Sequence, residues 1–98
     1  MAIGVYFNFE NTTLEQYDEV SRKLNNGHPL TKLSQWPGGG ILEHSAWQEE
    51  SGSLCVFDVW ESAEAFQSFG EKLMPIIGEV GLPQAEPHIV ELHNFITS

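Results

Sequence analysis

Positive charge and cysteine are both scarce in this chain. It holds 4 Lys and Arg residues against 14 Asp and Glu residues, which gives a formal net charge of −10 at pH 7. Nucleic acids and anionic membrane surfaces are bound through Lys and Arg, so the composition argues against both partners. The single cysteine, Cys55, excludes an internal disulfide framework, and its place in an apolar run predicts a small buried side chain.

Long hydrophobic runs are also missing. No stretch approaches the length of a membrane span, and the N-terminus lacks the basic and then apolar regions of a signal peptide. We therefore expect a cytoplasmic protein. Of its 98 residues, 41% are hydrophobic, which predicts a single globular domain over residues 1–98. The core of so small a domain is thin, and dimerisation is a common way to bury more surface.

The periodicity of the apolar residues predicts six elements. These are strands at 2–9, 41–49, 53–60 and 88–96, and helices at 13–25 and from 63 onward. With right-handed crossovers, this order predicts an α+β fold, the ferredoxin-like βαββαβ arrangement with a four-stranded antiparallel sheet. Both helices should cover one face, with the first and third strands central. Apolar residues on the uncovered face favour a homodimer.

Local signals mark the ends of the two helices. Thr12 and Glu15 have the spacing of a capping box for the first helix, and Ser62 is the expected N-cap of the second. Pro75 should bend or end the second helix. The glycine run 38–40 leads into a strand rather than a helix, which indicates a turn or lid and argues against a phosphate site.

The hairpin between the second and third strands decides which side chains meet Asp58. A three-residue turn with Gly52 in the left-handed conformation places His44 opposite Asp58 and Leu42 opposite Trp60. A two-residue turn places Ser45 opposite Asp58 instead and moves His44 to the other face. We favour the three-residue turn.

A cross-strand pair of His44 and Asp58 has a specific chemistry. The carboxylate fixes the tautomer of the imidazole and raises the basicity of its other nitrogen, which could then remove a proton from a phenol or an acidic carbon. The alternative is a structural or solvated Asp–His pair. Glu91 and His93 share a face of the last strand, but two ligands are too few for a metal site, and we expect none.

The stretch VFDVWESAEAFQSF, residues 56–69, resembles the antibiotic biosynthesis monooxygenase-like family of dimeric α/β barrels. That family commonly carries a strand ending in V-W-x-S, followed by a helix that opens with a small or acidic residue and Phe. Val59-Trp60-Glu61-Ser62 and Ala65-Phe66 match this pattern, and the order of elements fits essentially the whole chain. The resemblance implies a homodimer whose sheets form a barrel, with a pocket between sheet and helices in each subunit.

The resemblance also indicates residues that could line the pocket. In the better-known enzymes of the family, a Trp at the end of the third strand and an Asn near the end of the first strand do so. Trp60 matches the first directly, and Asn8 matches the second approximately. Tyr6 lies on the same face of its strand as Asn8, and we include it with Phe66 among the expected pocket residues.

Two activities known in the family can be compared with the residues of this sequence. Its members include cofactor-independent oxygenases of polycyclic phenols or quinols and haem-degrading enzymes. The latter use a histidine of the second helix to bind iron, and residues 66–80 contain none. Oxygenation in turn lacks an evident oxyanion partner, because no arginine lies in the expected strands.

The sequence therefore predicts a small dimeric barrel that binds an aromatic or otherwise apolar small molecule. As an enzyme it would be a monooxygenase without a cofactor, with His44 as the base and Asp58 as the group that orients it. The alternative is a non-catalytic ligand-binding, stress-response or accessory module of the same fold. A third possibility, haem or metal binding, would show in the absorbance or metal content of the purified protein.

Overall fold

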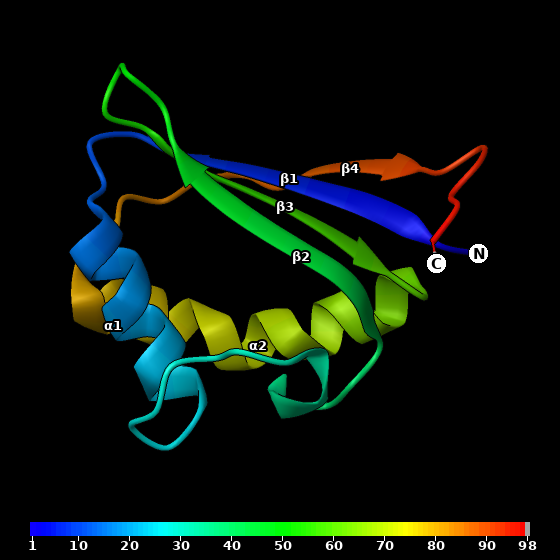
Figure 1. Ribbon diagram of the computed structural model, residues 1–98, viewed down its shortest axis with the longest axis horizontal. Helices are drawn as coiled ribbons and strands as arrows, with labels where there is room; N and C mark the ends of the chain where they lie inside the picture. The colour runs from blue at the N-terminus through cyan, green and yellow to red at the C-terminus, as the bar shows by residue number, and fades with distance from the viewer. Residues whose placement is uncertain (98) are drawn as a thin grey trace.

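Two helices lie against one face of a four-stranded antiparallel sheet (Figure 1). The computed structural model describes residues 1–97. Its elements are, in chain order, β1 (Ile3–Phe9), α1 (Leu14–Leu24), a short 3-10 helix η1 (Leu33–Gln35), β2 (Ile41–Gln48), β3 (Leu54–Trp60), α2 (Ala63–Val80) and β4 (His88–Glu91). This is the predicted α+β, ferredoxin-like arrangement, and the prediction is confirmed.

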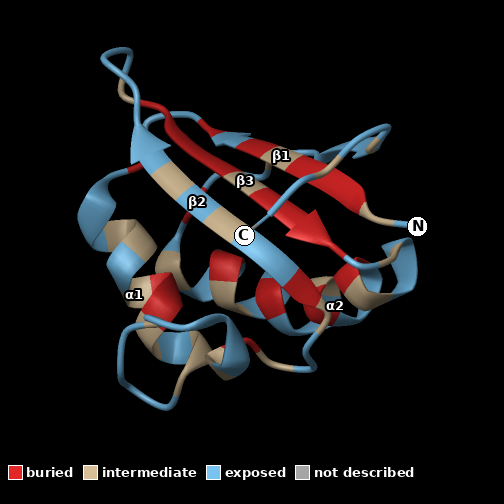
Figure 2. Ribbon diagram, turned by 45° about the vertical axis from the view of Figure 1, so that its right-hand side comes forward, coloured by how far each residue is buried: buried red, intermediate tan, exposed pale blue. Residues whose placement is uncertain are grey.

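The strand order is β2-β3-β1-β4, so β1 and β3 are central, as predicted. Their residues are nearly all buried, and the buried stripes of the helices face them (Figure 2). Val5 and Trp60 are fully buried on the face of the sheet that the helices cover. The main core therefore lies between that face, here called the inner face, and the two helices.

The N-cap of helix α1 lies one residue later than predicted. Thr13, not Thr12, is the N-cap, and it forms a capping box with Gln16 rather than with Glu15. Thr12 is fully buried, and its hydroxyl donates to the carbonyl of Glu10. Thr13 has the extended backbone conformation that an N-cap requires, with φ −92° and ψ 162°.

Helix α2 follows the prediction at its start and exceeds it at its end. Ser62 caps it as predicted, and a stripe of Phe66, Phe69, Leu73 and Ile77 is buried against the sheet. The helix continues through Pro75 to Val80, so of the two predicted outcomes, a bend or an end, Pro75 does not produce the end. The helix ends at Gly81, whose φ of 86° is in the left-handed region that favours glycine.

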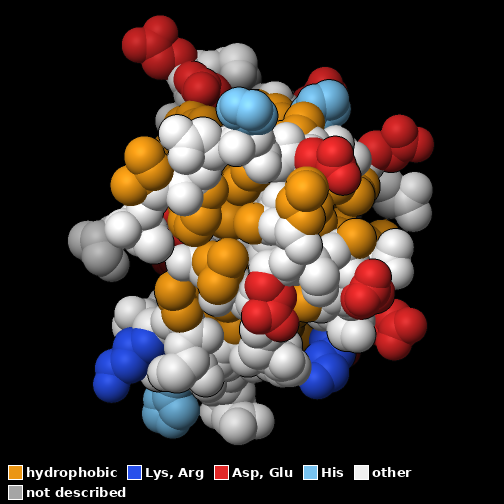
Figure 3. All heavy atoms as spheres, turned by 90° about the vertical axis from the view of Figure 1, so that its right-hand side faces the viewer, with side chains coloured by type: hydrophobic (Ala, Val, Ile, Leu, Met, Phe, Trp, Pro, Cys, Tyr) orange, Lys and Arg blue, Asp and Glu red, His pale blue; other side chains and the backbone are white. Residues whose placement is uncertain are grey.

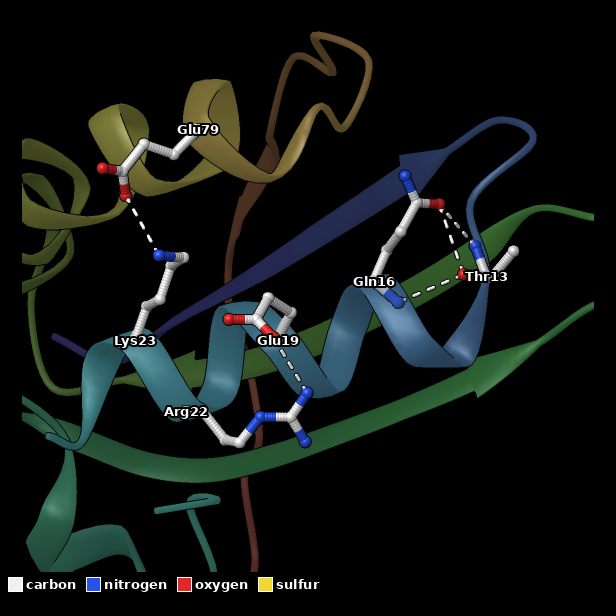
Figure 4. A network of polar contacts seen from close by, with 6 residues as sticks. All are labelled: Thr13, Gln16, Glu19, Arg22, Lys23 and Glu79. Atoms are coloured by element: carbon white, nitrogen blue, oxygen red, sulfur yellow. Dashed lines mark hydrogen bonds and ion pairs between the residues drawn. The ribbon is translucent and has the colours of Figure 1, made fainter. Parts of the chain in front are cut away.

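The outer sides of the helices carry exposed ion pairs (Figure 4). Arg22 bonds Glu19 within α1 at 2.9 Å, and Lys23 reaches Glu79 of α2 at 3.7 Å. The Arg22 guanidinium lowers the pKa of Glu19. Exposed pairs of this kind contribute little to stability because solvent screens them, so the packing of the two helices depends mainly on their apolar sides.

The turn between β2 and β3 has the predicted three-residue form. The N–H of Glu49 donates to the carbonyl of Ser53 at 2.8 Å, and Gly52 has a φ of 93°. This register places His44 directly opposite Asp58, as predicted.

A β-bulge near the start of β2 overturns one part of the predicted pairing. Ile41, not Leu42, lies opposite Trp60, because the register shifts between Ile41 and Glu43. The bulge turns Ile41 into the core at 7% exposure and leaves Leu42 40% exposed. It thus keeps an apolar contact with Trp60 without moving His44 away from Asp58.

Strand β4 is shorter than the predicted 88–96. It pairs only with the first half of β1, over Ile3 to Tyr6, and all four of its residues are exposed. None of the helices formed by residues 1–97 combines the length and the apolar character needed to cross a membrane.

Candidate functional site

A cavity of about 60 Å³ lies between the inner face of the sheet, α1, α2 and the connection formed by residues 25–40. Its lining is mostly aliphatic and aromatic, with contributions from both central strands and both helices. Four polar side chains also line it: Tyr17, Ser21, His44 and Asp58. An apolar cavity with a few convergent polar groups is typical of a small-molecule site.

His44 and Asp58 are paired with each other in the lining of this cavity. Nδ1 of His44 lies 2.5 Å from Oδ1 of Asp58, and the two side chains are 16% and 5% exposed. An ionised carboxylate can only accept hydrogen bonds, so Nδ1 of His44 carries the proton and donates it. This contact provides the buried carboxylate with the partner that it needs, and it leaves Nε2 of His44 as an acceptor.

Tyr17 of α1 completes a chain of three polar side chains. Its hydroxyl lies 2.6 Å from Nε2 of His44, and since Nε2 accepts, the hydroxyl donates. The phenol and imidazole rings are nearly parallel, with an interplanar angle of 11°. Burial, together with the negative charge of Asp58, raises the pKa of Tyr17 to about 12. Tyr17, His44 and Asp58 are here called the polar triad.

The sequence predicted the contact between His44 and Asp58 but did not identify Tyr17 as their neighbour. The signal that could have identified it is chemical. Tyr17 and Ser21 put two hydroxyl groups, four residues apart, on the side of α1 that faces the sheet.

The connection 25–40 covers one side of the cavity. Trp36 is buried, and its ring centroid lies 4.8 Å from that of His44. The connection is held near α1 where the hydroxyl of Ser21 accepts a hydrogen bond from the N–H of Leu30 at 2.7 Å. The cavity is far smaller than typical ligand pockets of about 300–1,000 Å³, so an aromatic ligand can enter only if part of the lining moves.

Trp60 and Phe66 lie in the core rather than in the lining of the cavity. Their rings pack against each other at 5.9 Å in an edge-on arrangement, and Trp60 is fully buried. Among the contacts of residues 1–97, the indole Nε1–H of Trp60 has no hydrogen-bond partner.

Tyr6 and Asn8 lie on the outer face of the sheet, away from the helices and outside the lining of the cavity. The hydroxyl of Tyr6 donates to Sγ of Cys55 at 3.3 Å, a contact that raises the pKa of Tyr6. Asn8 is exposed. The structure therefore brings His44 and Asp58 together at the cavity but separates them from Tyr6 and Asn8.

A metal-ligand cluster is not found in the part of the chain that the structure describes. No three His, Cys, Asp or Glu side chains within residues 1–97 gather closely enough to hold an ion. The chemistry that these residues can supply is that of the polar triad, namely proton transfer in an apolar cavity.

Solved structures of other proteins match this fold over nearly the whole chain. SnoaB from Streptomyces nogalater, described as a cofactor-independent oxygenase, has a TM-score of 0.66 at 14% identity, and the match covers 99% of this chain and 98% of SnoaB. Rv0793 from Mycobacterium tuberculosis has a TM-score of 0.70 at 10% identity, covering 99% of this chain and 100% of Rv0793. A candidate antibiotic biosynthesis monooxygenase from Chloroflexus aurantiacus has a TM-score of 0.65 at 12% identity, covering 99% of this chain and 98% of that one.

No protein-family model and no curated protein sequence matches the chain. The likeness to the solved structures, at 10–14% identity, is therefore one of fold. It confirms the fold expected from the stretch at residues 56–69. The chain has the fold of the antibiotic biosynthesis monooxygenase-like proteins.

Proposed function

We propose that this protein binds an aromatic or otherwise apolar small molecule in the cavity and oxygenates it with O₂, without a metal or organic cofactor. The observation that carries the proposal is the pair of His44 and Asp58, 16% and 5% exposed, in the lining of a mostly apolar cavity. The fold shared with SnoaB supports the same reaction class. In this proposal His44 is the base and Asp58 the group that orients it.

The reaction that fits this site begins with removal of a proton from an activated carbon or a phenol. The resulting anion is delocalised over the aromatic rings and can react directly with O₂ to give a peroxide. The proton held at His44 passes to the peroxide, which loses water to leave a carbonyl group. For a methylene substrate, one substrate and one O₂ give one ketone and one water, so the balance needs no other reductant.

Anthrone, a tricyclic aromatic with an acidic methylene group, is a suitable probe for this chemistry. We expect the protein to convert anthrone to anthraquinone under O₂, measured by absorbance and by oxygen uptake. His44→Gln retains an amide donor for Asp58 but cannot accept a proton, so its rate should fall by about 10²-fold or more. The exposed His93, beyond β4, provides the control His93→Ala, which should keep the wild-type rate. A His44→Gln variant as fast as wild type would remove His44 from the reaction.

We also propose that two copies of the chain associate through the outer face of the sheet. On that face Trp47 and Val90 are 40% and 38% exposed and Phe57 is partly buried, whereas Cys55 and Val59 between them are already buried within one chain. Figure 3 shows a different side, the one near the chain termini at the right of Figure 1, where hydrophobic side chains also gather at the centre with acidic side chains around them. An exposed apolar surface with a polar rim is typical of a protein interface.

A second candidate function is a ligand-binding module without catalysis. The observation that favours it is that both imidazole nitrogens of His44 already have partners, as in a purely structural polar cluster. This function predicts that a ligand retained on purification, or added anthrone, binds without being consumed. The anthrone assay therefore decides between the two functions.

A further inference from the structure

We propose that Tyr17, rather than His44, is the residue that takes the proton from the substrate, with His44 and Asp58 acting through it. This inference rests on the proposed function and assigns its reacting atom. The hydroxyl oxygen of Tyr17 would accept the proton of the substrate while its own proton moves to Nε2 of His44.

The hydrogen bonds within the polar triad favour proton transfer from the substrate to Tyr17 and from Tyr17 to His44. Nδ1 of His44 donates to Asp58, so its one remaining lone pair is on Nε2, and that lone pair already accepts from Tyr17. His44 therefore has no acceptor left for a substrate while the triad is intact. A hydroxyl oxygen that donates its proton still has lone pairs with which to accept another, and the hydroxyl of Tyr17 is in that position.

The other polar side chains of the cavity are less suited to this role. Asp58 is 5% exposed at its side chain and bonds His44. The hydroxyl oxygen of Ser21 accepts from the N–H of Leu30, which ties it to the connection 25–40. Of the four polar residues in the lining, Tyr17 is the one whose hydroxyl bonds Nε2 of His44.

A relay of two protons also avoids an unfavourable intermediate. A free phenolate at Tyr17 would be buried and close to the charge of Asp58, and the pKa of about 12 reflects that cost. When the two transfers occur together, Tyr17 remains neutral and the positive charge forms on His44, beside Asp58. The hydroxyl of Tyr17 then donates a hydrogen bond to the new substrate anion, the donor that an arginine in the strands would otherwise supply.

The substrate class follows from this geometry. The group that loses the proton must reach the hydroxyl at the α1 side of the cavity, so the substrate must carry an acidic C–H or O–H at its edge, and the lining must move to admit an aromatic molecule. Removal of such a proton by a positioned group typically contributes about 10²–10⁴-fold to a rate.

The two tyrosines of the chain provide a matched pair of variants. Tyr17→Phe removes the relay oxygen, whereas Tyr6→Phe removes a hydroxyl that bonds Cys55 on the opposite face of the sheet. With anthrone under O₂, Tyr17→Phe should lose about 10²-fold or more of the rate and Tyr6→Phe should keep it. A ¹⁵N NMR signal from a protonated Nδ1 of His44 in Tyr17→Phe shows that the pair with Asp58 persists in the folded variant.

A solvent isotope effect separates the relay from a structural role of Tyr17. In the relay, the exchangeable proton of the Tyr17 hydroxyl moves in the same step as the C–H proton, so D₂O should slow proton abstraction by the wild type. In direct abstraction by His44, only the C–H proton moves. A wild-type rate that is the same in H₂O and D₂O, or a Tyr17→Phe rate equal to wild type, overturns the relay.

Exchange of the methylene hydrogens of anthrone with D₂O, without oxygen, tests the relay apart from oxygenation. Exchange that depends on Tyr17, without quinone formation under O₂, upholds the relay and refutes the oxygenase. Quinone formation that does not depend on Tyr17 upholds the oxygenase and refutes the relay. A wild-type protein that accelerates neither reaction refutes both.

Discussion

Tyr17 is kept neutral by its surroundings, and this has a consequence for stability. Its pKa is about 12 in the folded chain, raised by burial and by Asp58, whereas an unperturbed tyrosine titrates at about 10. Between these values the folded chain retains a proton that the unfolded chain has released. The free energy of unfolding that this difference provides is fully present below about pH 10 and is lost as the pH rises towards about 12.

The variant Tyr17→Phe tests this linkage. We expect it to be less stable than wild type near neutral pH, because it lacks the hydrogen bond to His44, and the difference should narrow between about pH 10 and about pH 12. Urea unfolding at several pH values measures the difference. Tyr6 is present in both proteins, so its own titration cancels. A difference that stays constant over this range contradicts the assigned surroundings of Tyr17.

Some contacts of the site residues could be predicted from the sequence, and others could not. The contact of His44 with Asp58 could be predicted because it depends on local geometry, namely the length of one turn and the alternation of two strands. The contact of Tyr17 with His44 could not, because it depends on how α1 is rotated and tilted over the sheet. Strand and helix periodicities do not contain that information.

At the scale of elements, the helices and strands were predictable and the irregularities between them were not. Apolar periodicity determined the order of the elements and the buried stripe of α2. The bulge at Leu42 depends on packing between Ile41 and Trp60 across the sheet. Strand β4 ends early and pairs with β1 only over Ile3 to Tyr6. Thr12 is fully buried just before the start of α1. These features arise from tertiary contacts.

The connection 25–40 joins β2 at Gly40, a position that has no room for a larger side chain. A Cβ on Gly40 would lie 2.6 Å from Cβ of Ala65 on α2, whereas a Cβ on Gly38 would meet nothing within 4 Å. Both glycines have similar positive φ values, 87° and 84°. Gly38 therefore serves as a matched control in which only the backbone strain is present.

We expect Gly38→Ala to lower the free energy of unfolding by about 1–2 kcal/mol, the cost of the left-handed conformation. Gly40→Ala should lose a further amount of about 1–3 kcal/mol, because α2 must move to admit the methyl group. Chemical denaturation of both variants measures the difference. Equal losses in the two variants would show that the connection does not pack closely on α2.

At the scale of the whole molecule, one layer of helices leaves the outer face of the sheet uncovered. Neighbouring residues of β4 allow a test of the proposed dimer. Val90 pairs with Gly4 and faces outward, whereas Ile89 pairs with Val5 and faces inward, and both are exposed, at 38% and 47%. A glutamate at the outward position would be buried in the interface without a partner, at a cost of a few kcal/mol.

We therefore expect Val90→Glu to be monomeric at concentrations where wild type and Ile89→Glu are dimeric. Analytical ultracentrifugation measures the masses, and circular dichroism checks that the variants are folded. A wild-type protein that is monomeric, or a Val90→Glu variant that is as dimeric as wild type, would refute an interface on this face.

The position of Asp58 behind His44 determines the electrostatics of the whole site. Before reaction, the buried cavity holds one negative charge, that of the carboxylate. In the proposed reaction, proton transfer would leave a carboxylate, an imidazolium and a substrate anion in the cavity. Any proton transfer within the cavity conserves its net charge, but in an apolar enclosure the placing of the separated charges matters. Asp58 lies beside the imidazole, so the positive charge of the proposed reaction would form next to a negative charge that is already there.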